Sequence, residues 1–257
     1  MAIRFYSQGA PSWWPYHVLT LSSPNLPVGA FPESVIVDNN AFTFYRRGSF
    51  PQLDQWVARI ARVAHRASSF SAEVVVVLPD CPLDPLRTLL WAKRARWLCK
   101  HYRCMAVMHY DTLAEEELES TFESYAADVD AHVYAVPLKL PLSTGYSRLA
   151  RRVNVDPKLQ KHVVRVAARV VGGKLHLMAP RKETIVSMWD RIESFDTTAW
   201  TRASAKLKRK LGTISCRNQR ERELMFAHYI VELEKAGVDI HRSSLAKAVL
   251  EAAGVEA

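Results

Sequence analysis

The chain has 257 residues, of which 49% are hydrophobic and 24% charged, a composition typical of folded globular proteins rather than disordered ones. Its longest apolar runs, such as VVVVL at 74–78, are too short to span a bilayer. Its start lacks the basic, apolar and small-residue pattern of a signal peptide. We therefore expect a cytoplasmic protein with no membrane partner, built as one large domain or as two.

The formal net charge of +9 favours a polyanionic partner, and nucleic acid is the commonest. Two basic segments stand out, one containing the single acid Glu221 and the other containing none. The first comprises Arg202, Lys206, Lys208, Arg209, Lys210, Arg217, Arg220 and Arg222, and the second Arg87, Lys93, Arg94, Arg96, Lys100 and Arg103. Acidic residues gather instead between Asp111 and Asp130. This segregation predicts a basic face and an acidic face.

The four cysteines show no pairing that would indicate a metal or redox motif. They are Cys81, Cys99, Cys104 and Cys216, and they form no CxxC pair and no cluster with zinc-binding spacing. We expect reduced, mostly buried thiols, and the sequence predicts neither a metal site nor a cofactor.

Short β-branched runs alternate with helical patterns along most of the chain. The predicted strands lie at 2–7, 17–21, 34–38, 73–80, 104–110, 131–138, 174–180 and 193–198. The predicted helices lie at 53–67, 85–100, 112–127, 157–171 and 181–192, and two further helices, broken near Gly237, fill 221–253. Runs that are apolar on both faces indicate a covered parallel sheet. The alternation predicts an α/β fold, a (β/α)8 TIM-like barrel over 1–215 with a C-terminal helical extension over 216–257.

Three acids stand at the ends of predicted strands: Asp38, Asp80 and Asp196. His109 ends a fourth strand. In a parallel barrel these strand ends meet at the catalytic face, so we expect the four side chains to lie near one another. Each acid taken alone is as readily explained as a helix cap or a turn residue.

The same segments resemble the tRNA-guanine transglycosylases and their relatives, the 7-deazaguanine DNA transglycosylases. In chain order, the matching segments are DNNAF at 38–42, DCP at 80–82, LM at 177–178 and FDTTAWTR at 195–202. The likeness covers about residues 17–210. The resemblance implies a TIM-barrel fold and an enzyme that exchanges guanine for a deazaguanine base without cutting the backbone of the nucleic acid.

The resemblance implies a role for each matching residue. Asp196 corresponds to the nucleophile that forms a covalent bond to the sugar, and Asp38 to the group that gives a proton to the departing base and takes one from the incoming base. Asp80, Phe42, His109 and Met178 are the expected base-binding residues, with Phe42 placed to stack on the base. The expected phosphate-binding residues are Arg202, Lys206, Lys208, Arg209 and Lys210. The implied partners are tRNA or DNA and a small deazaguanine-type base.

Several segments depart from the family pattern. Residues 39–41 read NNA where the tRNA enzymes have Ser-Gly-Gly, residues 108–110 read MHY in place of Val-Gln-Gly, and residues 135–137 read AVP in place of a glycine-rich loop. The family's zinc-binding cysteine cluster is missing. Two alternatives therefore stay open: a catalytically degenerate nucleic-acid-binding relative, and a base-removing glycosylase. The sequence does not decide whether the substrate is tRNA or DNA, which base enters, which position is modified or what the oligomeric state is.

Overall fold

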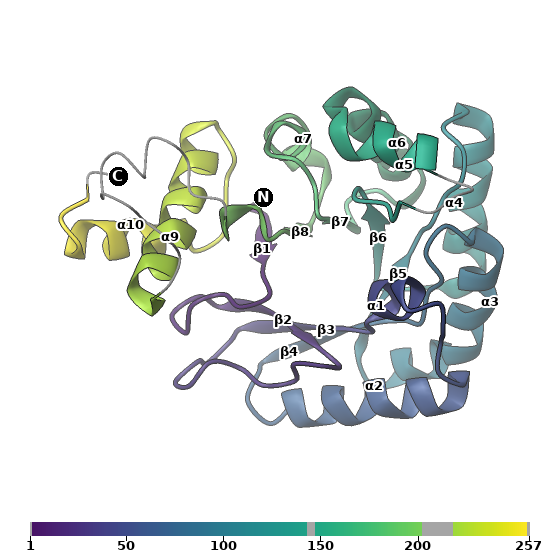
Figure 1. Cartoon of the computed structure of the whole chain (residues 1–257), viewed down its shortest axis with the longest axis horizontal. Coiled ribbons are helices and arrows are strands. Elements are labelled where there is room, and N and C mark those ends of the chain that lie inside the picture. Colours follow the sequence, from purple (N-terminus) through teal and green to yellow (C-terminus); the bar gives the residue numbers. More distant parts are fainter. Residues whose placement is uncertain (1, 143–146, 202–217, 256–257) are drawn as a thin grey trace.

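A computed structural model of the chain describes residues 2–142, 147–201 and 218–255. Within them, eight parallel strands form one sheet in the order β1-β8-β7-β6-β5-β4-β3-β2. The strands are β1 (Arg4–Tyr6), β2 (Tyr16–Thr20), β3 (Ser34–Asp38), β4 (Glu73–Val77), β5 (Arg103–Val107), β6 (Val133–Pro137), β7 (Leu175–Met178) and β8 (Ser194–Asp196). A parallel bridge between Ser7 and His17 links the two ends of the sheet. The fold is therefore a nearly closed (β/α)8 TIM-like barrel, as the sequence predicts (Figure 1).

Helices surround this ring of strands (Figure 1). They are α1 (Ala41–Arg46), α2 (Leu53–Ala67), α3 (Pro85–Ala95), η1 (Arg96–Lys100), α4 (Glu115–Val129), α5 (Ser147–Val155), α6 (Pro157–Val171), α7 (Lys182–Met188), η2 (Trp189–Arg191), η3 (Ala199–Thr201), α9 (Gln219–Lys235) and α10 (Ser243–Ala252). Loops without helix join β1 to β2 and β2 to β3. The side chains of Asp84 and Asp156 cap α3 and α6, and each is followed by proline at the first helical position. In the described part of the chain, none of these helices is long and apolar enough to cross a membrane.

The C-terminal helices cover the outer side of β1 and β8 (Figure 1). Phe226 of α9 stacks on Phe5 with ring centroids 5.3 Å apart, and Phe5 stacks in turn on Phe195 of β8 at 4.8 Å. Trp200 of η3 also meets Phe226 edge-on at 5.3 Å. The two C-terminal helices thus share one hydrophobic core with the barrel. The predicted boundary between residues 215 and 216 lies outside the described residues.

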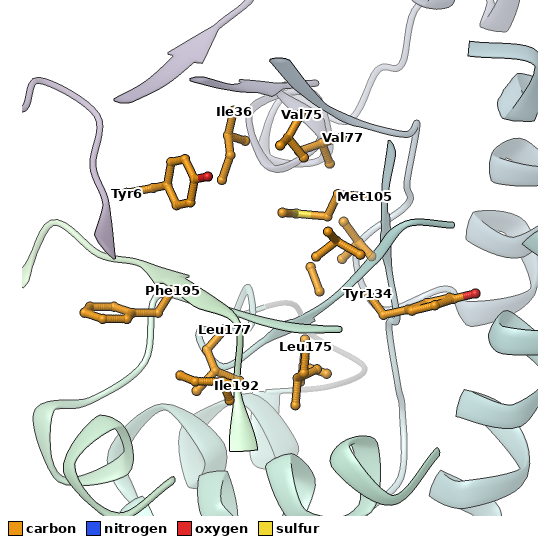
Figure 2. Close-up of a cluster of buried hydrophobic side chains, with 14 of the residues drawn as sticks. Tyr6, Ile36, Val75, Val77, Met105, Tyr134, Leu175, Leu177, Ile192 and Phe195 are labelled. Atoms are coloured by element: carbon orange, nitrogen blue, oxygen red, sulfur yellow. The ribbon is translucent and has the colours of Figure 1, made fainter. Parts of the chain in front are cut away.

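Side chains alternate between the barrel interior and the layer beneath the helices, because successive residues of a strand point to opposite faces. Figure 2 shows Tyr6, Ile36 and Met105 pointing into the space enclosed by the strands, whereas Phe195 and Tyr134 point away from it. The same alternation directs the last residues of β3 and β8, Asp38 and Asp196, to the inner side. The pleat of the strands therefore brings acids from opposite ends of the chain toward one mouth.

Three residues of the second basic segment pair with acids in the structure. Arg103 starts β5 and is half-buried, and its guanidinium lies 2.9 Å from Glu73 and 2.5 Å from Glu193. Two further members pair with surface acids, Arg87 with Asp84 at 3.3 Å and Lys93 with Asp128 at 3.1 Å. Arg94, Arg96 and Lys100 are exposed, so the basic face stays a prediction for this part of the segment.

Candidate active site

A cavity of about 260 Å³ lies at the carboxyl ends of the strands. Its walls include six of the residues predicted from sequence: Asp38, Phe42, Asp80, His109, Met178 and Asp196. They come from the ends of five strands and from α1, so the fold gathers them from positions far apart in the chain. The volume lies just below the roughly 300–1,000 Å³ typical of drug-sized ligands, which suits a single heterocycle. The sequence reasoning missed other wall residues, among them Asn39, Pro82, Pro137, Lys139 and Pro141.

Asp38 ends β3 and enters a tight turn. Asn40 lies in the left-handed region with φ 64°, a conformation that asparagine tolerates better than most residues. That turn aims the backbone N–H of Asn40 at Asp38 Oδ1, 2.8 Å away. The side chain of Asn40 accepts from the N–H of Leu21 and donates to Ser22 Oγ, both at 2.9 Å. The turn therefore does not require glycine at position 40, because asparagine adopts the left-handed conformation there.

The pKa of Asp38 is raised from its ordinary value of 3.8 to about 7. Burial is the largest cause, because it disfavours the charged form, and the negative charges of Asp80 and Asp196 act in the same direction. The hydrogen bond from Asn40 opposes the shift. Asp38 is thus suited to hold and release a proton near neutral pH.

Asp80 follows β4 and is held from two sides. Asn39 Nδ2 donates to its Oδ1 at 2.5 Å, and His109 Nε2 lies 2.6 Å from its Oδ2. Asp80 is 5% exposed, and these two donors compensate the loss of water around a buried carboxylate. Trp56 donates to the carbonyl of Asn39 at 2.7 Å and fixes the turn from behind. Each carboxylate oxygen can still accept a second hydrogen bond from a ligand.

Asp196 ends β8 and has a different environment. Its side chain is 29% exposed, and Oδ1 lies 3.0 Å from Nε2 of His176, a buried residue of β7. The other ring nitrogen, Nδ1, lies 2.8 Å from Ser194 Oγ. In the described part of the chain, no side chain bonds to Asp196 Oδ2. The sequence reasoning missed His176, because only the strand register reveals its contact.

Phe42 and Met178 complete the apolar part of the wall. Phe42 is 43% exposed, so it is not a core residue, and its ring is available to a ligand. Met178 ends β7, opposite Asp196 in the strand register. An aromatic ring and a thioether beside three carboxyl groups favour a flat, polar-edged ligand.

A second, polar cavity of about 390 Å³ adjoins the first and shares Lys139 and Ala179 with it. Three cations line it: Lys139, Arg181 and Lys182. Arg181 donates to the carbonyl of Asn154, and Lys182 pairs with a glutamate at 3.3 Å. Lys139 is exposed and forms no ion pair within residues 2–142, 147–201 and 218–255. The predicted phosphate-binding residues Arg202, Lys206, Lys208, Arg209 and Lys210 lie outside the described residues.

The site is thus an acidic pocket at the mouth of a TIM-like barrel. Among the described residues, no group of three histidine, cysteine, aspartate or glutamate side chains could hold a metal ion. Comparison of the sequence with protein-family models and with curated proteins finds no match. The geometry itself therefore has to carry the functional argument. Among the described residues, the site has one acid whose pKa is near 7 and one carboxylate with an oxygen that no side chain bonds, the pair of groups that a retaining displacement requires.

Proposed function

We propose that this protein is a base-exchange transglycosylase that replaces guanine by a 7-deazaguanine-type base in tRNA or DNA. The observation that carries the proposal is the placement of Asp38 and Asp196 on one cavity, with the pKa of Asp38 near 7. The resemblance of DNNAF at 38–42 and FDTTAWTR at 195–202 to the transglycosylases supports it.

In the proposed reaction, Asp196 Oδ2 attacks C1′ of the target nucleotide. The bond from C1′ to the guanine nitrogen breaks, a bond from C1′ to Oδ2 forms, and Asp38 gives its proton to the departing guanine. The incoming base then attacks C1′, expels Asp196 and returns a proton to Asp38. Two displacements retain the configuration at the sugar, and the covalent intermediate keeps the nucleic acid backbone intact.

The pocket also fits the recognition of guanine. Asp80 is an acceptor fixed in place by Asn39 and His109, and the N1–H and 2-amino groups of guanine are donors that adenine does not match. Adenine leaves the second acceptor position on each Asp80 oxygen without a donor, and an unmatched buried acceptor costs about 1–3 kcal/mol, which discriminates against a wrong base by roughly tenfold to a hundredfold. Phe42, exposed on the wall, supplies a stacking surface worth about 1–3 kcal/mol per base.

A nucleotide must leave its stack to place C1′ between two carboxyl groups, so the enzyme has to hold the backbone beside it. The polar cavity lies at Thr197, one residue after Asp196. Among the described residues, its lining has a single acid, Glu183, beside the cations Lys139, Arg181 and Lys182, and these cations support a role in holding a neighbouring phosphate. Lys139 borders both cavities. This arrangement supports a nucleic acid as the substrate rather than a free nucleoside.

The test is incubation with labelled guanine and either total tRNA or duplex DNA, followed by measurement of incorporation. Asp196→Asn should abolish incorporation, and a denaturing gel should show a covalent protein–nucleic acid adduct for the wild type alone. Full exchange by Asp196→Asn on every substrate of the wild type would refute the proposal. Release of free base without incorporation would instead assign a glycosylase, and binding without adduct or exchange a degenerate relative.

A further inference from the structure

His176 and Ser194 lie below Asp196 inside the barrel, where no substrate reaches them. His176 is 1% exposed, and it sits directly opposite Ser194 in the register of β7 and β8. Its imidazole joins two levels of the barrel, with Nδ1 2.8 Å from Ser194 Oγ and Nε2 3.0 Å from Asp196 Oδ1. The ring of Tyr6 packs edge-on against it at 6.2 Å between centroids.

The two contacts fit an arrangement of protons in which the imidazole is neutral. A carboxylate only accepts hydrogen bonds, so Nε2 carries the hydrogen that lies between His176 and Asp196. Nδ1 of the neutral ring is then an acceptor, and the hydroxyl of Ser194 donates to it. This chain of donors holds Asp196 Oδ1, and among the described residues no side chain bonds to Oδ2 of this cavity-lining carboxylate.

We propose that His176 is the positioning residue of Asp196: it fixes Oδ1, so that Oδ2 is the oxygen that attacks the sugar carbon, and Ser194 sets the ring tautomer. The proposal rests on the proposed function for its kinetic consequence, but the hydrogen-bonded arrangement exists whatever the reaction. An unrestrained carboxylate rotates and presents Oδ2 in the attacking geometry only part of the time. A misplacement of about 1 Å can slow a reaction by about 100-fold.

The kinetic test compares two substitutions of His176. Glutamine places an amide N–H where Nε2 was, whereas leucine fills the space without a donor. His176→Leu should slow formation of the covalent adduct by about 10- to 100-fold while the Kd for the nucleic acid stays within about twofold. His176→Gln should recover most of the rate. His65→Gln, which changes an exposed histidine of α2, serves as the matched control and should form the adduct at the wild-type rate.

Several results would overturn the assignment. Adduct formation by His176→Leu at the wild-type rate would show that Asp196 needs no restraint. An equal loss of rate in His176→Gln, or a loss of binding that matches the loss of rate, would indicate a structural role alone.

A second measurement tests the arrangement without any activity. Long-range ¹H–¹⁵N NMR of histidine-labelled protein distinguishes the two ring nitrogens, and comparison with His176→Gln identifies the signal of His176. We expect the Nε2-protonated neutral tautomer, and a proton on Nδ1 would refute the proposal. This measurement decides the matter if His176→Leu fails to fold. If the wild type exchanges no base and forms no adduct, the proposed function fails while the NMR result still tests the positioning role.

Discussion

The stability of the variant Asp38→Asn, measured relative to the wild type, should increase as the pH rises. Burial, together with the charges of Asp80 and Asp196, raises the pKa of Asp38 from 3.8 to about 7. Between these two values the folded protein retains a proton that the unfolded chain releases. The free energy of unfolding of the wild type therefore falls as the pH rises from about 4 to about 7. Asparagine has nearly the same shape and does not titrate, so the variant lacks this loss.

The size of the effect follows from the shift. Each unit of pKa corresponds to about 1.4 kcal/mol, so the shift of about three units sets an upper bound of roughly 4 kcal/mol above pH 8. Only the part above pH 5, about two units and roughly 2.7 kcal/mol, lies in the window from pH 5 to pH 8. Asp38 is partly open to the cavity, and solvent there weakens the interaction. We expect the advantage of Asp38→Asn to grow by about 1–3 kcal/mol across this window.

Urea unfolding of the wild type and Asp38→Asn at pH 5 and pH 8 measures this change directly. Asp54→Asn, at an exposed position in the first turn of α2, is the control, and its difference from the wild type should not depend on pH in this range. If the difference between Asp38→Asn and the wild type is the same at both pH values, Asp38 does not keep its proton in the fold. The proton donor of the proposed reaction would then be lost as well.

Four further predictions follow from particular contacts. The pKa of Glu73 is lowered by Ser34, Arg103 and Arg4, so this carboxylate stabilises the fold above about pH 4.5. Glu73→Gln should lower the free energy of unfolding by about 1–3 kcal/mol at pH 7, and urea unfolding should show this difference shrink as the pH falls below 4.5. Asn40→Ala should be less stable than Asn40→Gly by about 1 kcal/mol in the same assay, because both lose the side-chain bonds but only alanine is strained at φ 64°. Phe226→Ala should cost about 3–5 kcal/mol in thermal unfolding, because it removes the ring on which Phe5 and Trp200 pack. The binding constant for tRNA or duplex DNA should fall as the salt concentration rises, and the slope of its logarithm against the logarithm of the salt concentration should be smaller by about one for Lys139→Ala. A slope near zero for the wild type would contradict a phosphate-binding site.

The strands and most helices could be predicted because local pattern and tertiary packing agree. The predicted bounds of α2 and α6 are those of the structure, since each has a clear apolar stripe and α6 begins at Asp-Pro. Among the described residues, the α-helices that were missed are α1 and α5, and both are short. Helix α1 has six residues, follows a left-handed asparagine and has no side-chain cap, so its sequence contains no pattern that predicts a helix.

Candidate site residues that directly follow a strand were predictable, because the strand ends of a parallel barrel lie together at one mouth. Asp38, Asp80 and Asp196 follow apolar runs, and parallel strands bring such ends together. The partner of Asp196 was not predictable, because a contact between neighbouring strands depends on the register. His176 in KLHLM interrupts an apolar strand, and only its place opposite Ser194 and below Asp196 explains a histidine there. Arg103 was assigned to a basic face because its partner Glu193 is 90 residues away in the chain, on a strand end that is not a neighbour in the sheet.

Two of the three acids in the cavity pair with a histidine from the neighbouring strand, yet the pairs cannot serve the same purpose. Asp80 is buried and receives one donor on each oxygen, which makes it a fixed acceptor with little freedom to move. Asp196, on the wall of the same cavity, is 29% exposed and receives one side-chain donor, on Oδ1, among the described residues. A carboxylate that must form a bond to carbon needs an unoccupied oxygen, so Asp196 suits nucleophilic attack and Asp80 suits recognition. Asp38, whose pKa is raised by burial and by the charges of both neighbours, is the acid suited to keep a proton. The number of hydrogen bonds that each acid receives and its burial thus give three chemically identical side chains different environments in one cavity, and these environments match the three roles of the proposed reaction: proton donor, acceptor and nucleophile.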